Sequence, residues 1–219
     1  FANIAQGYAD YGFVYGFSTS VVGRGMSKPD DYTKETIDTI EAQVDASKEK
    51  TTVTAGNEPN IICILLESFI DPYEVNFLQM SEDPIPTFHS LEQNFSTGYL
   101  TVPVVGAGTA NTEFEVLTGM NIQYFGTGEY PYKTVLKSAD CPSVESIASD
   151  LSSIGYGTHV VHNNTATFYS RNNAFSKMGF DTFTSKELMN ITEYTPSGSW
   201  PTDKVLVNET VKAMDATEG

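Results

Sequence analysis

Cysteine, histidine and tryptophan are scarce in this chain of 219 residues, which has two, three and one of them. Two cysteines, Cys63 and Cys141, are too few for a disulfide framework. Cys63 lies inside the apolar run 61–66, so we expect it to be a small core residue. That run is the longest uninterrupted one and is far shorter than the roughly 18 apolar residues of a membrane span. The sequence therefore excludes a disulfide-rich module and predicts no membrane-spanning helix within these residues.

Basic residues are also scarce. The chain has 12 Lys and Arg against 28 Asp and Glu, which gives a formal net charge of -16. The basic residues are scattered singly, whereas phosphate backbones and anionic lipid surfaces require a concentrated basic patch. Composition therefore excludes a nucleic-acid-binding protein. The chain is 40% hydrophobic and 12% aromatic, which is enough to fill a core and excludes a disordered chain.

The first part of the chain differs in pattern from the rest. Residues 1–30 mix aromatic residues with glycine without a sustained period, and we expect an irregular lead-in segment there. Ile37, Ile40 and Val44 recur at helical spacing among charged residues, which predicts an amphipathic helix over 32–48. Residues 51–59 are polar and resemble a linker. We place a domain boundary near residue 57, dividing a lead-in segment and linker helix (1–56) from a domain at 57–219.

After residue 57, patterns typical of strands and helices alternate. Strands are expected at 60–66, where a continuous apolar run indicates burial on both faces, and at 99–105 and 156–162. Helices are expected at 86–95, 109–118, 142–154, 168–177 and 203–214. This alternation predicts an α/β fold with a mostly parallel sheet flanked by helices.

Glu67 directly follows the first predicted strand. Ligands of parallel sheets gather outside the carboxyl ends of the strands, and a carboxylate there could hold a hard cation. The alternative is that Glu67 is only the first polar residue after the strand.

Thr109 follows a glycine-rich turn, residues 106–108, at the start of a predicted helix. Free N–H groups at a helix N-terminus favour anions, and a threonine hydroxyl could act as a nucleophile if a metal lowered its pKa. The alternative is that Thr109 only caps the helix.

Two further candidates are a histidine at the end of the third predicted strand and an arginine in the helix that follows it. His159 and His162 are three residues apart and would face opposite sides of a strand, so only one can line a site. His162, at the strand end, is the better placed. Arg171 begins the next helix and could bind a phosphate through two parallel hydrogen bonds, although a solvated arginine is the alternative.

Five sequence blocks occur in an order that resembles the lipoteichoic acid synthase family, sulfatase-like phosphoglycerol transferases of the alkaline phosphatase superfamily. They are Leu-Leu-Glu-Ser (65–68), Gly-x-Gly-Thr-x-x-x-Glu-Phe (106–114), His-Asn-Asn (162–164), Phe-Tyr-Ser-Arg-Asn (168–172) and Met-Gly-Phe-Asp (178–181). The resemblance covers about 57–215, and 11–48 looks like the segment that precedes the enzyme domain in this family. It implies the N-terminal part of a sulfatase-like extracellular domain, incomplete at the C-terminus and anchored to the cell membrane by helices outside this sequence.

The resemblance also implies roles for individual residues. Glu67 would bind a divalent metal, usually manganese in this family, with magnesium as the alternative. Thr109 would be a second ligand and the nucleophile that attacks phosphatidylglycerol, leaving glycerophosphate on the threonine and releasing diacylglycerol. Arg171 would hold the glycerophosphate, with His162 nearby. Tyr169 stands where relatives often have tryptophan, which leaves the head group open. The acceptor would be a glycerol-phosphate polymer or a glycolipid.

One departure from the family concerns the metal site. The family completes it with an Asp-His pair in the second half of the domain, and no Asp-His dipeptide occurs in this sequence. We therefore expect an incomplete metal site and no catalysis by these residues alone. A divided sheet would also expose an edge and an apolar face, which favours self-association.

Other functions fit the same residues. A phosphoethanolamine transferase or a phosphodiesterase would use the same threonine and metal. A non-catalytic module could bind a glycerophosphate polymer or a protein in the same cleft. Hydrolysis of sulfate esters is disfavoured, because this chain has threonine where the sulfatases proper have a modified cysteine.

Overall fold

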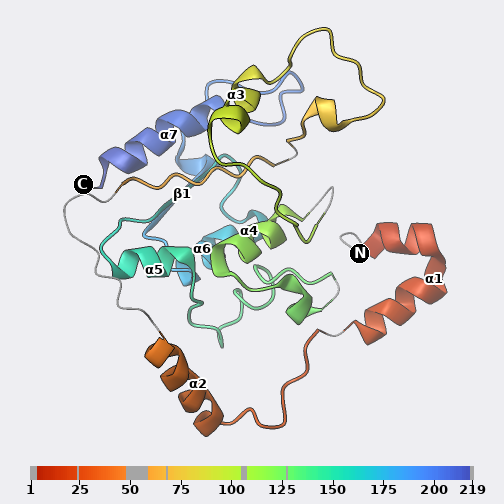
Figure 1. Cartoon of the computed structure of the whole chain (residues 1–219), viewed down its shortest axis with the longest axis vertical. Helices are drawn as coiled ribbons and strands as arrows, with labels where there is room; N and C mark the ends of the chain where they lie inside the picture. The colour runs from red at the N-terminus through yellow and green to blue at the C-terminus, as the bar shows by residue number, and fades with distance from the viewer. Residues whose placement is uncertain are drawn as a thin grey trace.

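The computed structural model describes residues 4–23, 25–47, 59–67, 69–104, 108–126 and 128–217, and shows helices arranged around a short parallel sheet (Figure 1). Helices α1 (Ile4–Val22) and α2 (Lys34–Ser47) lie outside the body that the later residues form. The proposed boundary near residue 57 and most of the predicted linker lie outside the described residues. None of the described helices is long and apolar enough to cross a membrane.

Helix α1 corrects the expectation of an irregular lead-in segment. Its aromatic residues lie four apart and therefore meet along the helix: Tyr11 pairs with Tyr15 at 5.2 Å and Phe13 with Phe17 at 5.7 Å between ring centroids. Gly12 interrupts the helical backbone with a φ of 81°. Gly12, one of the glycines that obscured the helical period in the sequence, thus produces a kink. Helix α2 confirms the predicted amphipathic helix and has no buried residue.

The sheet consists of β1 (His159–His162) and β2 (Thr182–Ser185), which are parallel, with His159 opposite Thr182 and His162 opposite Ser185. A short 3-10 turn η3 (Phe168–Ser170) and helix α6 (Arg171–Lys177) connect the two strands. This βαβ unit confirms the predicted fold class of helices with a parallel sheet. Strand β1 is shorter than predicted, and β2 was not predicted.

The other two predicted strands are not formed. Neither 60–66 nor the described residues of 99–105, which end at Val104, pair with another described strand. Ile64 is 77% exposed and Tyr99 is 97% exposed. The prediction that 60–66 is buried on both faces is therefore wrong in this structure, because a buried strand requires hydrogen-bonding neighbours and covering helices. Cys63 is likewise exposed and not part of the core.

The core lies between α4 (Thr109–Thr118), α6 and the turns at 131–140. Helix α4 begins and ends where predicted, and Gly119 ends it with a φ of 70°, the left-handed conformation that favours glycine. Aromatic rings fill the core edge to face. Its buried members are Ala110, Phe114, Tyr132, Leu136, Ala174, Phe175 and Met178.

Helix α5 (Ile147–Ser153) begins five residues later than its predicted start at 142. Ser146 is the reason, because its hydroxyl accepts hydrogen bonds from the backbone N–H groups of Ala148 and Ser149, and the Ser149 hydroxyl accepts one from the N–H of Ser146. Ser146 also donates to the Met178 carbonyl at 2.5 Å. This capping serine therefore ties α5 to the end of α6.

The remaining elements are short, apart from the last helix. They are η1 (Pro72–Glu74), α3 (Pro86–Asn94), η2 (Ile122–Phe125), η4 (Lys186–Leu188) and α7 (Lys204–Asp215). Helices α3 and α7 confirm the two helices predicted there. Helix α3 buries little of its apolar surface, since Leu91 and Phe95 are exposed and only Phe88 is half-buried, against the ring of Phe69.

Candidate functional site

The N-terminus of α4 brings Thr109 beside Glu67. The Thr109 hydroxyl donates a hydrogen bond to Oε1 of Glu67, which lies 42 residues earlier in the sequence. Gly108 precedes the helix with a φ of 87°, and a Cβ at this position would lie 3.1 Å from the Tyr130 hydroxyl. Glycine is therefore favoured here both by the backbone conformation and by the close approach of Tyr130. Two predicted site residues thus meet at the start of this helix.

Arg171 is fully buried at the start of α6, with 1% of its surface exposed. Its guanidinium forms a two-pronged ion pair with Glu113: Nε donates to Oε2 at 3.0 Å, and Nη2 donates to Oε1. The third nitrogen, Nη1, is buried and has no hydrogen-bond partner among the described residues. The structure therefore excludes the alternative of a solvated arginine and leaves one buried charged donor without a partner.

Glu113 is a site residue that the sequence analysis did not identify. It lies four residues after Thr109 on α4, so both side chains lie on the same side of the helix. One helix therefore holds both the candidate nucleophile and the carboxylate that fixes Arg171. The signal was present in the motif Gly-x-Gly-Thr-x-x-x-Glu-Phe, where the spacing of four from threonine to glutamate places them together.

A strained turn positions Tyr169. The predicted helix over 168–177 begins as η3, in which Tyr169 and Ser170 have φ angles of 57° and 61°, a left-handed conformation that is unfavourable for residues other than glycine. The Tyr169 ring lies 5.2 Å from the Arg171 guanidinium carbon and stacks on Tyr130 at 5.5 Å. Lys133 lies on the same ring, with its Nζ 4.7 Å from the centroid. The turn thus places an aromatic ring against two cations.

His162 lies at the carboxyl end of β1 and is half-buried, and its Nε2 is buried without a hydrogen-bond partner among the described residues. Burial lowers the pKa of His162, and the positive charge of Arg171 lowers it further. The carboxylates of Glu113 and Glu67 act in the opposite direction. The imidazole is therefore neutral near pH 7. Its electrostatic interactions with Arg171 and Glu67 place His162 in the same neighbourhood as the other candidates.

All five predicted positions, Glu67, Thr109, His162, Tyr169 and Arg171, thus gather between the N-terminus of α4, the end of β1 and the start of α6. Glu67 and Thr109 offer a carboxylate and a hydroxyl, which are the oxygen donors that manganese and magnesium prefer. This pair fits as part of a metal site. The surroundings combine a buried cation, a neutral imidazole and aromatic rings, which suits an anionic ligand.

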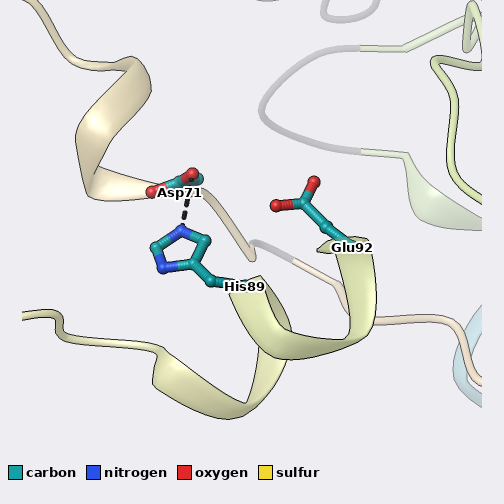
Figure 2. A group of neighbouring side chains, drawn as sticks. All are labelled: Asp71, His89 and Glu92. Atoms are coloured by element: carbon teal, nitrogen blue, oxygen red, sulfur yellow. Dashed lines mark hydrogen bonds and ion pairs between the residues drawn. The ribbon is translucent and has the colours of Figure 1, made fainter. Parts of the chain in front are cut away.

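A second group of possible metal ligands lies elsewhere in the structure. One ligand atom each from Asp71, His89 and Glu92 lies within 4.8 Å of the other two (Figure 2). Asp71 precedes η1, and the other two residues lie on α3. This group was not predicted from the sequence. The His-x-x-Glu spacing on a predicted helix was a usable signal, whereas the approach of Asp71 from 18 residues away was not.

Comparison with known proteins identifies the class. The family model of the sulfatases matches residues 59–218. That match covers well over half of the chain, so the chain belongs to the sulfatase family, a family of enzymes whose members are generally metal-dependent. The sulfatase-like family predicted from the five sequence blocks is thereby confirmed.

Individual relatives are more distant. A protein of Rhizobium meliloti (strain 1021), whose name provisionally assigns it to cyclic beta-1,2-glucan modification, is 27% identical over 213 residues, or 97% of this chain and 31% of the relative. The lipoteichoic acid synthase LtaP from Listeria monocytogenes is 24% identical with a TM-score of 0.44, over 52% of this chain and 26% of that one. An alkaline phosphatase superfamily protein from Vibrio parahaemolyticus is 23% identical with a TM-score of 0.36, over 49% of this chain and 24% of that one.

These matches also show what fraction of each relative the chain covers. The chain spans about a third of the length of the curated relative and about a quarter of each solved structure. Both TM-scores are below 0.5, so the family assignment depends on the sequence match.

Proposed function

We propose that the protein is a sulfatase-family transferase that moves glycerophosphate from phosphatidylglycerol to a hydroxyl acceptor through a phosphothreonine intermediate at Thr109. The observation that carries this proposal is the hydrogen bond from Thr109 to Glu67 at the start of α4, the helix whose Glu113 also pairs with the buried and incompletely paired Arg171. A hydroxyl nucleophile, a carboxylate partner and a free cationic donor are the groups that phosphoryl transfer requires.

Arg171 would recognise the phosphate. Its Nη1 is a buried charged donor without a partner, and Glu113 holds the guanidinium plane in place through two bonds. A phosphate oxygen at Nη1 would gain a charge-assisted hydrogen bond in surroundings that screen charge poorly. The neutral His162, with its free Nε2, would bind a second oxygen or a hydroxyl of the head group.

In the first step, Oγ1 of Thr109 would bond to phosphorus while the bond from phosphorus to the diacylglycerol oxygen breaks. Diacylglycerol leaves with the proton that Thr109 gives up, and the glycerophosphate remains on the threonine. The threonine proton leaves along the existing hydrogen bond to Glu67. A divalent metal bound at Glu67 and Thr109, manganese in this proposal, would supply the positive charge that lowers the pKa of the hydroxyl.

In the second step, the oxygen of an acceptor hydroxyl would bond to the same phosphorus while the bond from phosphorus to Oγ1 of Thr109 breaks. The acceptor proton would pass by way of Glu67 to Oγ1, which restores the threonine hydroxyl. The first candidate acceptor is a glycerol-phosphate polymer or a glycolipid. The second is a glucan, which the name of the Rhizobium meliloti relative supports, since that match extends over 97% of this chain. Because the lipid donor lies in a membrane, we place the reaction at the extracellular face of the cell membrane. The net charge of -16 means that attraction for the anionic lipid must come from local groups such as Arg171.

The nucleophile is tested by Thr109→Ala in the full-length protein, supplied with phosphatidylglycerol and manganese. We expect diacylglycerol release to fall by at least about a thousandfold, since the covalent route is lost. Thr109→Ser, which keeps a hydroxyl, should retain measurable turnover and serves as the matched control. Unchanged diacylglycerol release by the alanine variant would exclude Thr109 as the nucleophile.

The donor and acceptor are tested with lipids that carry a labelled head group. Glycerol-labelled phosphatidylglycerol should transfer its label, whereas equal or faster transfer from labelled phosphatidylethanolamine would indicate a phosphoethanolamine transferase. Label recovered in cyclic beta-1,2-glucan would favour the glucan acceptor, and label in a glycerophosphate chain the polymer. Release of free glycerophosphate only, with every acceptor present, would indicate a phosphodiesterase.

A further inference from the structure

Helix α3 and the turn before it converge on one imidazole. His89 and Glu92 are three residues apart on α3, so both side chains lie on one side of the helix. Asp71 reaches them from the start of η1, where its carboxylate also accepts a hydrogen bond from the Tyr73 N–H at 2.8 Å. Figure 2 shows the imidazole and the two carboxylates facing a common space.

The orientation of His89 is fixed from three sides. Both oxygens of Asp83 lie 2.8 Å from Nδ1, and Oδ2 of Asp71 lies 3.0 Å from Nε2. The Tyr73 ring stacks on the imidazole at 5.2 Å with an interplanar angle of 4°. With Asp83 holding Nδ1, the ring directs Nε2 toward Asp71 and Glu92. A carboxylate on the far nitrogen of a ligating histidine is the arrangement that fixes the ring in many zinc sites.

The charges of this group are not balanced by protein cations. Asp71, Asp83 and Glu92 contribute three negative charges against at most one positive charge on His89. Within the described ranges, none of the three carboxylates forms an ion pair with lysine or arginine. No hydrogen bond or ion pair of the Glu92 carboxylate is found there either, although its oxygen lies within reach of the other two ligand atoms. A divalent cation would supply the missing positive charge.

We propose that Asp71, His89 and Glu92 bind a divalent transition-metal ion, with Zn²⁺ preferred over Mg²⁺, at a site separate from Glu67 and Thr109. One imidazole nitrogen and two carboxylate oxygens are a three-residue donor set of the type that holds zinc, with water completing the coordination. The imidazole decides the preference, because Mg²⁺ favours oxygen ligands alone. Glu67 and Thr109 offer oxygen only, so the two sites should differ in the metal that they select.

The ion would have a structural role. It would link η1 to α3 across the intervening segment 75–85 and fix the chain four residues after Glu67. This role does not depend on the proposed phosphoglycerol transfer, because the three ligands belong to other elements than Arg171, His162 and Thr109.

The test is Zn²⁺ titration by calorimetry of the full-length protein carrying Glu67→Gln and Thr109→Ala, which removes the oxygen site. We expect this variant to bind one equivalent of Zn²⁺, and to bind Mg²⁺ at least about tenfold more weakly. Glu92→Gln should weaken Zn²⁺ binding by about tenfold or more without disturbing the fold, since no hydrogen bond of this carboxylate is found in the described residues. Asp83→Asn should weaken it by roughly 10–100-fold through loss of the ring orientation.

Glu74→Gln is the matched control, because Glu74 is an exposed carboxylate in η1 outside the ligand set. The Zn²⁺ affinity of the Glu74→Gln variant should equal that of the parent. Co²⁺ in place of Zn²⁺ should give a visible absorption band that disappears in His89→Ala. Failure of the parent to bind Zn²⁺, or equal Zn²⁺ affinities in the parent and Glu92→Gln, would overturn the proposal. Neither result would affect the assignment of Thr109, which is measured by diacylglycerol release.

Discussion

Two stretches of the chain are both rich in apolar residues but bury them differently. In residues 108–185, strand, turn and helix follow one another closely and enclose Phe114, Tyr132 and Met178 completely. In residues 59–104, Ile64, Phe77 and other large side chains are largely exposed, and the only regular elements described are α3 and η1. The first stretch forms an interior with low dielectric, whereas the second remains in water.

The histidines of the two stretches illustrate the consequence. His162 is controlled by its surroundings, because burial and Arg171 lower its pKa. His89 is controlled by explicit partners, because hydrogen bonds to Asp83 and Asp71 raise its pKa. The same side chain is thus held neutral in one stretch and favoured as a cation in the other. Chemistry that needs a neutral base or donor belongs to the first stretch, whereas a metal bound at His89 in the second stretch would have to displace the proton of Nε2.

The largest effect on stability is expected from replacing an aromatic residue of the core with alanine. Phe114 packs edge to face against Phe125 at 5.4 Å and Tyr132 at 6.5 Å. Phe114→Ala should lower the free energy of unfolding by about 3–5 kcal/mol, measured by urea denaturation. Phe77→Ala, at a position that is 85% exposed, should change it by less than about 0.5 kcal/mol. Equal losses of unfolding free energy in the two variants would show that residues 59–104 are packed as tightly as the core.

A smaller effect is expected from removing one charge of the buried ion pair. Glu113→Gln keeps the shape of the side chain but leaves the Arg171 charge buried without a counter-ion, which should cost about 2–3 kcal/mol in unfolding free energy. Glu193→Gln is the control, since Glu193 pairs with Lys204 at the surface and such pairs contribute less than about 1 kcal/mol. If both variants lost the same unfolding free energy, the buried pair of Glu113 with Arg171 would contribute no more to stability than the surface pair of Glu193 with Lys204.

Helices with clear end signals could be predicted from the sequence. Gly119 marks the end of α4, and the apolar spacing at 203–214 marks α7, so both were found within a residue or two. Local chemistry decides such boundaries. The start of α5 was missed because Pro142 competed with Ser146 as the start signal, and only the hydrogen bonds of Ser146 identify it as the cap.

Features that depend on distant partners could not be predicted. Strand β2 has only four residues, Thr-Phe-Thr-Ser, and becomes a strand by pairing with β1. The ion pair between Glu113 and Arg171 joins residues 58 positions apart in the sequence. The burial of Arg171 therefore could not be predicted from the residues next to it in the sequence. Conversely, the run 60–66 predicts a strand from composition alone, while strand formation also requires a partner that the described residues do not provide.

The smallest effect is a pair of opposite pH dependences, measured without metal in the presence of a chelator. The raised pKa of His89 means that its contribution to stability is complete below its ordinary pKa of 6.5 and is lost as pH rises through the raised value. The pKa values of its partners Asp71 and Asp83 are lowered, so their contribution is lost only as pH falls below the ordinary 3.8. Wild type should therefore exceed His89→Gln in unfolding free energy by more at pH 6 than at pH 9.

His162 should behave in the opposite way. Because its pKa is lowered, the unfolded chain takes up a proton before the folded one as pH falls below 6.5, and folding loses stability there. Arg171 strengthens this loss, while Glu113, Glu67 and Asp203 oppose it. Relative to wild type, His162→Gln should therefore gain stability between pH 8 and pH 5 as measured by urea denaturation. If the stability of the two variants relative to wild type changed with pH in the same direction, the distinction would be contradicted. That distinction is between a histidine whose pKa is lowered by burial and one whose pKa is raised by its hydrogen-bond partners.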